Sequence, residues 1–369
     1  MKFLHLADLH LGKRLNDVSF LEDQVRLLCQ VEEIARNEQA DAVLIAGDVY
    51  QKASPQSEAM AAFDQFITRL KSMGLRVFVI SGNHDSAQRI SYFSSLLKQT
   101  GVYVSEAFDG RLQQVTLQDG YGEIVVSLLP FLKPVQVRQF YPDEKIETYQ
   151  DAMQTVLRHS PVDPAKRNVL VCHQFITGAE ISDSEEKTLG GLDNIDASVF
   201  ADFDYVALGH IHKPQKCTRE TLRYAGSLMK YSFSEVNQKK SVTVVEMGEK
   251  GSLSVEKIPL SPLRRIRIVR GTGAEALKQA CDDYVRVELT EAASEGEGEL
   301  QERLRSAFPR LLEVVRVVRT AAEEETIGTE QRPQTDPYAL CRAFLGEMNE
   351  TDEAILRDVL NTVMGGGAQ

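Results

Sequence analysis

Residues 1–12 read MKFLHLADLHLG, and this stretch decides how the rest of the chain is interpreted. An apolar run over residues 3–7 is followed at once by Asp8 and His10. Four more apolar runs end in a similar way, with the motifs Gly47-Asp48, Gly82-Asn83-His84-Asp85, Cys172-His173-Gln174 and Gly209-His210-Ile211-His212. The chain has seven histidines, and five of them lie in these motifs. Such a set of side chains can hold a pair of divalent metal ions facing a phosphate.

The five apolar runs are typical of strands that are buried on both faces. They cover residues 3–7, 42–46, 77–81, 169–172 and 205–208. Apolar residues at helical spacing separate the first three runs, and this alternation predicts an α/β fold with parallel strands. Each motif then lies at the carboxyl end of its strand, where open α/β sheets bind ligands. We therefore expect the five segments to converge on one site.

The pattern changes after about residue 260. Residues 265–270, 284–289 and 314–319 are expected to be strands, with helices over 274–281 and 299–307, so a small second α/β domain is predicted. A polar stretch follows and is typical of a linker. The end of the chain resembles a helical hairpin, in which Asp336 and Pro337 begin one helix and Thr351 caps the next.

The composition, with 43% hydrophobic and 26% charged residues, is that of an ordinary globular protein. No apolar run approaches the roughly 18 residues needed to cross a bilayer. The five scattered cysteines predict neither a disulfide framework nor a zinc knuckle. The first residues enter a strand and do not have a signal-peptide layout, so a cytoplasmic location is expected.

The charge and the motifs limit the class of function. A net charge of −12 argues against a protein that coats nucleic acid without specificity. It still permits a cleft in which metal cations meet a phosphate, since such ions are the largest local charges. The chain contains no P-loop motif, so any dependence on ATP has to come from a partner.

Phosphodiester hydrolysis is the chemistry that these residues favour. It needs charge neutralisation at the phosphoryl oxygens and a nucleophile near neutral pH, which two metal ions about 3.5–4 Å apart can supply. Asp48, directly after the conformationally permissive Gly47, is the natural carboxylate to bridge the two ions. Mixed nitrogen and oxygen donors favour Mn²⁺, Fe²⁺ or Zn²⁺ over Mg²⁺.

Each motif alone also has a simpler explanation. A single Asp-x-His is weak evidence, and Gly47-Asp48 could be a turn that ends a strand. Asp85 could cap the helix that follows it. His210 and His212 would lie on one face of a strand end, an arrangement that also arises by chance. The series of five motifs, each after an apolar run, favours the metal site.

In this order the motifs resemble the signature of the calcineurin-like metallophosphoesterases. Within that family the resemblance is to the SbcD nuclease subunits, and it covers essentially the whole chain. It is carried by residues 1–12, Gly47-Asp48-Val49-Tyr50, Ser81-Gly82-Asn83-His84-Asp85-Ser86, Tyr224-Ala225-Gly226-Ser227 and Phe233-Ser234-Glu235. It implies a four-layer αββα nuclease domain over residues 1–262 and a small α/β DNA-capping domain over 263–320. A linker over 321–335 and a partner-binding helical hairpin over 336–369 would follow.

The resemblance also implies roles for individual residues and two divalent ions per chain, with Mn²⁺ favoured. One ion would be held by Asp8, His10, Asp48 and His212, and the other by Asp48, Asn83, His173 and His210. His84 would be the catalytic histidine, which protonates the leaving oxygen or stabilises the phosphorane. Asp85 would either orient His84 or cap a helix.

The implied function is a metal-dependent DNA nuclease that acts on duplex ends and on hairpins or single strands. It would work in DNA repair as a homodimer, together with an SbcC-type coiled-coil ATPase. DNA contacts are expected from the basic residues Arg264, Arg265, Arg267 and Arg270. Binding of the ATPase is expected through the hairpin residues Phe344, Leu345, Ile355, Val359 and Val363.

Two other functions fit the same motifs. A metallophosphoesterase acting on nucleotides or phosphoproteins has little need of the C-terminal third of the chain. A scaffold that holds DNA with purely structural metals has no need of an unliganded histidine such as His84.

Overall fold

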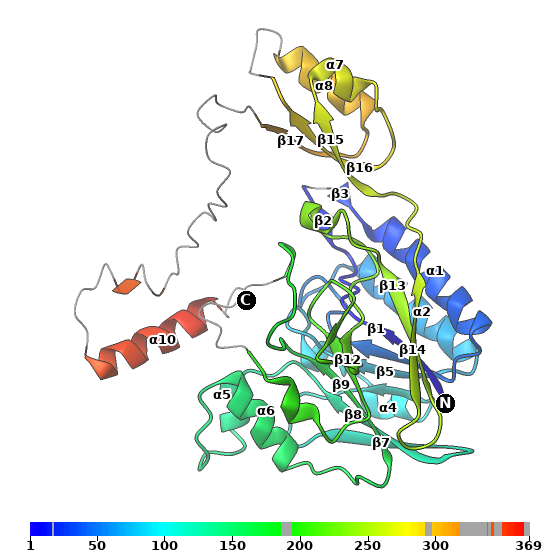
Figure 1. Cartoon of the computed structure of the whole chain (residues 1–369), viewed down its shortest axis with the longest axis vertical. Helices are drawn as coiled ribbons and strands as arrows, with labels where there is room; N and C mark the ends of the chain where they lie inside the picture. The colour runs from blue at the N-terminus through cyan, green and yellow to red at the C-terminus, as the bar shows by residue number, and fades with distance from the viewer. Residues whose placement is uncertain are drawn as a thin grey trace.

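The computed structural model describes residues 1–16, 18–185, 194–291, 297–317, 338, 341–342 and 349–364. Two large sheets and their helices form the main body, and a smaller sheet with two helices lies at one end of it (Figure 1). No helix among these residues is both long and apolar enough to cross a membrane.

The first sheet has six strands, in the order β14-β13-β1-β4-β5-β6. Its strands are β1 (Lys2–Leu6), β4 (Ala42–Ala46), β5 (Arg76–Ile80), β6 (Val102–Val104), β13 (Ser241–Met247) and β14 (Leu253–Pro259). β1, β4, β5 and β6 are parallel, whereas β13 pairs antiparallel with both of its neighbours. The apolar runs over residues 3–7, 42–46 and 77–81 are confirmed as three of these strands, within one residue at each end.

The second sheet has the order β11-β12-β10-β9-β8-β7. Its strands are β7 (Gln113–Asp119), β8 (Gly122–Leu129), β9 (Arg167–His173), β10 (Tyr205–Gly209), β11 (Gln215–Cys217) and β12 (Arg219–Tyr224). The four central strands are parallel, and the edge strands β7 and β11 are antiparallel. The expectation of parallel strands, made for the runs that helical segments separate, is confirmed by β1, β4 and β5, and short hairpins such as β7–β8 add antiparallel strands at the edges.

The strands alternate between two apolar layers. In β1, Phe3 faces the second sheet, while Leu4 and Leu6 pack under helices α1 (Leu21–Asn37) and α2 (Ser57–Ser72). The outer face of the second sheet is covered by helix α6 (Tyr149–Arg158). Helices and sheets thus form the expected αββα order, and its central apolar layer lies between the sheets.

Shorter elements complete the main body. They are β2 (Arg14–Leu15), β3 (Val18–Ser19), α3 (Ala87–Ile90), α4 (Ser94–Lys98), α5 (Pro134–Arg138), η2 (Ala197–Phe200) and η3 (Phe233–Glu235). α6 begins at a capping box in which Thr148 and Asp151 each accept a backbone N–H from the other. Local sequence thus fixes where this helix starts.

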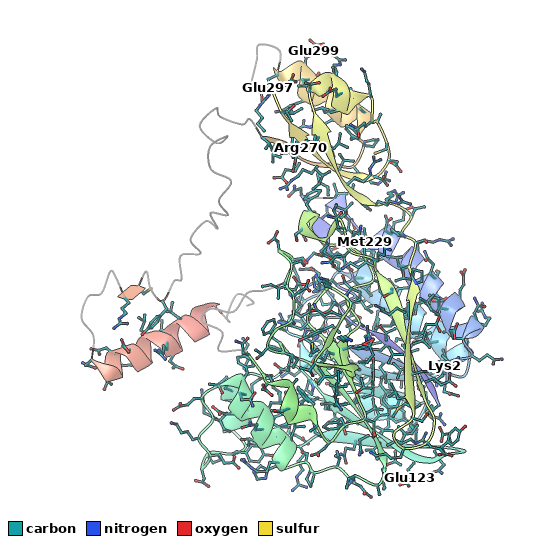
Figure 2. All side chains as sticks on the ribbon, in the orientation of Figure 1. Lys2, Glu123, Met229, Arg270, Glu297 and Glu299 are labelled. Carbon is teal, nitrogen blue, oxygen red and sulfur yellow. The ribbon has the colours of Figure 1, made fainter. Side chains whose placement is uncertain are left out.

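The small domain is a parallel sheet in the order β15-β16-β17 with two helices. Its elements are β15 (Ile266–Gly271), α7 (Gly273–Leu277), β16 (Tyr284–Leu289), α8 (Glu297–Ala307) and β17 (Leu311–Arg316). The last strand starts three residues earlier than expected, because the buried Leu312 packs into the core of the main body. Figure 2 shows Arg270, Glu297 and Glu299 on this domain, away from the large sheets.

The small domain is fastened to the start of α1. The buried carboxylate of Asp23 accepts hydrogen bonds from the Arg264 guanidinium at 2.7 Å and from the Tyr284 hydroxyl at 2.7 Å. Arg264 also pairs with Glu22 at 2.9 Å, and only 11% of its side chain is exposed. Arg264 was expected to contact DNA with the other arginines, but its guanidinium is committed to this interface.

The C-terminal hairpin is described only in part. Helix α10 spans Glu350–Met364, so Thr351 lies inside the helix and the expectation that it is the cap is wrong. Asn349 caps the helix instead, because its side-chain oxygen accepts the N–H of Asp352 at 2.9 Å. The Arg357 guanidinium lies 5.1 Å from the centre of the Tyr338 ring. Asp336, Pro337, Phe344, Leu345 and the side chain of Val363 lie outside the described residues.

Candidate metal centre

The loops that follow β1 and β4 run side by side and carry three of the predicted ligands. The N–H of Asp8 donates to Gly47 O at 3.1 Å, and the N–H of His10 donates to Asp48 O at 2.9 Å. Asp8, His10 and Asp48 have φ values of 53°, 43° and 51°. These left-handed conformations are uncommon outside glycine and typically mark functional sites. Gln24 of α1 supports the first loop, since its side-chain N–H donates to His10 O at 2.8 Å.

One carboxylate oxygen lies at the centre of the cluster. Oδ2 of the buried Asp48 is 3.4 Å from His173 Nε2, 3.6 Å from His10 Nε2 and 3.9 Å from His84 Nε2. The other oxygen, Oδ1, accepts the backbone N–H of His84 at 2.9 Å. Asp48 therefore faces imidazole nitrogens from the loops after β1 and β5 and from the last residue of β9.

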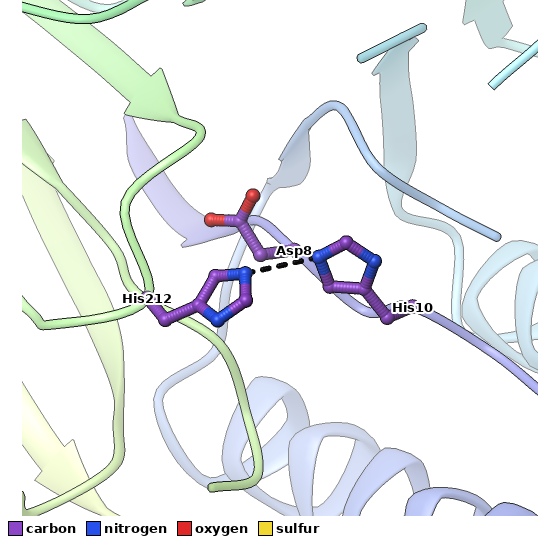
Figure 3. A group of neighbouring side chains, drawn as sticks. All are labelled: Asp8, His10 and His212. Atoms are coloured by element: carbon purple, nitrogen blue, oxygen red, sulfur yellow. Dashed lines mark hydrogen bonds between the residues drawn. The ribbon is translucent and has the colours of Figure 1, made fainter. Parts of the chain in front are cut away.

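Asp8, His10 and His212 form one group of neighbouring side chains, which Figure 3 shows, and His10 brings this group next to Asp48. The Nε2 atoms of His10 and His212 are 3.0 Å apart. Asp8 Oδ1 accepts the N–H of His210 at 2.9 Å, whereas Asp8 Oδ2 is buried and has no hydrogen-bond partner among the described residues. Two ring nitrogens and an unpartnered buried carboxylate oxygen form a donor set that fits a divalent cation.

On the other side the amide oxygen of Asn83 meets two imidazoles. Asn83 Oδ1 is 3.0 Å from His173 Nε2 and 3.0 Å from His210 Nδ1. His173 Nδ1 lies 2.7 Å from the carbonyl of Ala46, which can only accept, so Nδ1 carries the proton and Nε2 faces the cluster. This side also offers nitrogen and oxygen donors for a cation.

His210 and His212 do not share one face of a strand end, as the simple pattern suggested. β10 ends at Gly209, and His210 has a φ of 103°. The His210 ring packs 5.2 Å from the His173 ring, whereas the His212 ring packs 4.9 Å from the His10 ring. The turn between them therefore sends one imidazole to each side of Asp48.

His84 lies at the rim of the cluster. Its side chain is 18% exposed, against 1% for His10 and 0% for His173. Its ring stands edge-on to the His10 ring, with ring centres 4.8 Å apart. Its Nδ1 lies 3.2 Å from the carbonyl of Gln51. His84 is thus held beside the cluster, on the side that solvent reaches.

Asp85 joins the loops that follow β4 and β5. Its carboxylate accepts backbone N–H groups from Val49 at 3.0 Å, Tyr50 at 2.9 Å and Gly82 at 2.9 Å. The interpretation of Asp85 as a helix cap is wrong, because Ser86 is the N-cap of α3. Desolvation and the nearby charge of Asp48 raise the pKa of Asp85 to about 6.

Close backbone approaches require two of the glycines. A Cβ at Gly82 would lie 2.1 Å from Asp48 Oδ1, and a Cβ at Gly209 would lie 1.8 Å from Ala46 O. These approaches bring the motif loops of both sheets to one point.

The cluster is buried and electrostatically strained. Burial raises the pKa of Asp8 to about 6 and lowers the pKa of His210 to about 3. Burial also opposes the charging of His173, but the charge of Asp48 and its hydrogen bond raise the pKa of His173 to about 9. Cation binding at His173 would therefore displace a proton, so we expect binding to weaken as the pH falls.

Several residues around His212 were not predicted to have a role. Its backbone N–H donates to Glu185 at 2.8 Å, and its Nδ1 is 2.6 Å from the Ser184 hydroxyl. Its carbonyl accepts from the ammonium of Lys240 at 2.7 Å. Glu235 also lies near this ring, with its Oε1 3.7 Å from His212 Nδ1. Glu235 belongs to the Phe233-Ser234-Glu235 motif that contributes to the family resemblance, but the sequence did not predict its contacts.

Comparisons with known proteins identify two families that match parts of this chain. Residues 1–214 match the calcineurin-like phosphoesterase family. Residues 259–349 match the type 5 capsule protein repressor C-terminal domain family.

Two curated relatives are each named as the SbcD component of the nuclease SbcCD. The relative from Staphylococcus epidermidis is 32% identical over 327 residues, which cover 86% of both chains. The relative from Staphylococcus saprophyticus is 35% identical over 283 residues, which cover 76% of this chain and 74% of the relative.

Two solved structures show weaker likeness. A dimetal phosphatase from Danio rerio covers 71% of this chain and 98% of its own, with 11% identity and a TM-score of 0.41. The phosphoesterase Yfce from E. coli has the same coverage, with 14% identity and a TM-score of 0.30.

Proposed function

Because the chain belongs to the calcineurin-like phosphoesterases and, within them, to the SbcD nuclease subunits, we propose that it is a metal-dependent DNA nuclease whose site surrounds Asp48. The observation that carries this proposal is the position of Asp48 Oδ2 between His10 and His173. From there a single carboxylate can serve two cations. The two curated relatives are named as nuclease subunits, and the similarity covers 86% and 74% of their lengths.

The proposal divides the ligands as the family resemblance implies. Asp8, His10, Asp48 and His212 hold one ion, and Asp48, Asn83, His173 and His210 hold the other. The contact between His10 and His212 and the contacts of Asn83 with His173 and His210 support this division. Mn²⁺ is the proposed ion, because it accepts mixed nitrogen and oxygen donors.

The chain's own residues then orient the substrate and move a proton. Bound divalent ions supply positive charge at the phosphoryl oxygens and lower the pKa of water. His84, at the rim, delivers a proton to the leaving oxygen or stabilises charge on the phosphorane. Asp85 keeps the loops of Asp48 and Asn83 in register through its three backbone hydrogen bonds.

The proposed partner is an SbcC-type ATPase that binds the C-terminal hairpin. Ile355 and Val359, one turn apart on α10, are 57% and 49% exposed. Exposed apolar side chains at this spacing suit docking of the helix against another helix or a groove. A nuclease of this kind would work in the cytoplasm, the location expected from the sequence.

We also propose that the protein forms a homodimer. Tyr92, Phe93 and Leu96 follow the Gly82–Asp85 motif and are 70%, 62% and 60% exposed. Neighbouring exposed apolar side chains are typical of protein interfaces. Sedimentation should give the dimer mass for the native chain and the monomer mass for Phe93→Ser with Leu96→Ser.

Degradation of end-labelled duplex DNA in the presence of Mn²⁺ tests the nuclease proposal. The native protein should shorten the duplex and lose this activity when a chelator removes the metal. His84→Gln serves as the control for a contaminating nuclease, because it should be nearly inactive. Hydrolysis of nucleotides or phosphopeptides without any cleavage of DNA would instead establish the alternative phosphoesterase function.

A further inference from the structure

His212 is held at three points by residues outside the predicted ligand set. Its N–H donates to Glu185, its carbonyl accepts from Lys240, and its ring nitrogen Nδ1 lies 2.6 Å from the hydroxyl of Ser184. The first two contacts fix the backbone. The third acts on the imidazole itself.

The Ser184 hydroxyl also lies 2.5 Å from Glu235 Oε1. Glu235 is fully buried, and its other oxygen accepts from Lys240 at 2.5 Å. A carboxylate paired with a buried ammonium is ionised and can only accept hydrogen bonds. The Ser182 hydroxyl, 3.0 Å from Ser184 Oγ, donates its own proton to Glu185. Ser184 has one proton, so it donates that proton to Glu235 and accepts a hydrogen bond from His212 Nδ1–H.

This direction of hydrogen bonding determines the tautomer of His212. With the proton on Nδ1, the lone pair is on Nε2, the atom that lies 3.0 Å from His10 Nε2 and in one cluster with Asp8. Metal-binding histidines depend on such a partner at the second nitrogen, because it fixes the ring's tautomer and orientation. In His173 the partner of Nδ1 is a backbone carbonyl, which can only accept a hydrogen bond. In His212 the partner is a hydroxyl, which can either donate or accept, so a further residue has to fix its direction.

We propose that Ser184 and Glu235 are positioning residues: Glu235 orients the Ser184 hydroxyl, which then holds His212 as the Nδ1–H tautomer with Nε2 toward a divalent cation. This inference rests on the proposed metal-dependent function. It assigns a role to Glu235 of the Phe233-Ser234-Glu235 motif, and it explains why a buried Glu235–Lys240 pair stands behind the metal centre.

Mn²⁺ titration by calorimetry, without substrate, tests the inference. In Ser184→Ala the affinity for one of two ions should fall about 10–100-fold and the other should stay unchanged. Ser184→Thr keeps the hydroxyl and should bind both ions as the native chain does. Ser234→Ala is the matched control, because the Ser234 hydroxyl accepts the N–H of Asp183 at 3.0 Å and so anchors the residue before Ser184.

The tautomer can also be read without metal. In metal-free protein labelled with ¹⁵N at histidine, the His212 ring should show the Nδ1–H pattern in native protein and in Ser184→Thr. Ser184→Ala and Glu235→Gln should populate the Nε2–H form. Unchanged Mn²⁺ affinity in Ser184→Ala would overturn the positioning role of Ser184 and Glu235, and so would a loss of affinity in Ser234→Ala as large as that in Ser184→Ala. Either result would leave the nuclease proposal intact. A native chain that binds no Mn²⁺ would overturn both.

Discussion

His84 differs from the four predicted histidine ligands, which are all buried, in being partly exposed. We expect His84→Gln to keep both metal ions and DNA binding, because the side chain lies at the rim of the cluster. The loss of a general acid should lower turnover by about 10²–10⁴-fold. Single-turnover cleavage together with metal analysis measures the two effects. A variant that loses a metal ion would show that His84 is a ligand.

Asp48 is the shared residue of the proposed centre. Asp48→Ala should lose both ions, because its Oδ2 faces His10 on one side and His173 on the other. His10→Ala should weaken only one ion. Elemental analysis after dialysis against Mn²⁺ gives the stoichiometry directly. Two ions in Asp48→Ala would refute a bridging carboxylate.

The sequence predicted which residues meet at this scale but not how they are held. Asp8, His10 and His173 could be placed together because each follows an apolar strand. Asp85 and Ser184 were beyond prediction, since their roles depend on which backbone and ring atoms reach them after folding. The division of His210 and His212 between two sides also depends on a turn that a period-two pattern does not reveal.

Among the elements, the buried carboxylate of Asp23 contributes to the attachment of the small domain, together with the packing of Leu312 into the core of the main body. Arg264→Ala would leave Asp23 without its main partner and should destabilise this attachment by about 3 kcal/mol. Limited proteolysis near residue 264 at increasing urea concentrations measures the change in the stability of this attachment. Arg270→Ala is the matched control: its side chain is 56% exposed and lies 3.6 Å from Glu288, so it should change stability by less than about 0.5 kcal/mol.

The other three arginines, the exposed Arg265 and the β15 residues Arg267 and Arg270, are still expected to contact DNA. Arg267 and Arg270 have 42% and 56% of their side chains exposed. Replacing each with Ser should weaken DNA binding and reduce the salt dependence by about one unit of slope for each phosphate that the protein no longer binds. Lys145→Ser, an equal loss of charge on the loop between α5 and α6, controls for net charge. An unchanged salt dependence of DNA binding would show that β15 is not part of the DNA-binding surface.

Strand positions were predicted well where burial was two-sided and less well elsewhere. β1 and β4 are apolar on both faces and therefore stand out in the sequence. β17 was displaced by three residues, because Leu312 is buried by the main body rather than by its own domain. Asn349 and Thr351 lie two residues apart, and both have side chains that can cap a helix. The structure has Asn349 as the cap, a choice that depends on backbone geometry.

At the scale of the whole molecule, the C-terminal hairpin is expected to bind the partner and not to complete the nuclease. Truncation after Thr335 should leave the protein folded and active with Mn²⁺, but unable to co-purify with its SbcC-type partner. Circular dichroism, duplex degradation and co-purification measure these properties. Unfolding of the small domain, or intact partner binding, would contradict the docking role.

The order of layers could be predicted from the family resemblance, whereas the apolar runs predicted buried parallel strands. The fastening of the small domain could not, because it joins Asp23 to Arg264 and Tyr284, residues far apart in the chain. Long-range ion pairs of this kind do not produce a periodic pattern. The same limitation made Arg264 look like part of a DNA-binding surface.

The bond between Asp23 and Arg264 has a mechanical consequence. Asp23 is anchored to the small domain, and the next residue, Gln24, is anchored to the carbonyl of His10. Asp23 and Gln24 are adjacent residues in the first turn of α1. A rotation of the small domain that moves Asp23 would therefore also move Gln24 and the His10 loop to which Gln24 is hydrogen-bonded. We therefore expect that a DNA end or a partner protein that rotates the small domain also shifts the His10 loop of the proposed metal centre, without contacting any of the proposed ligands.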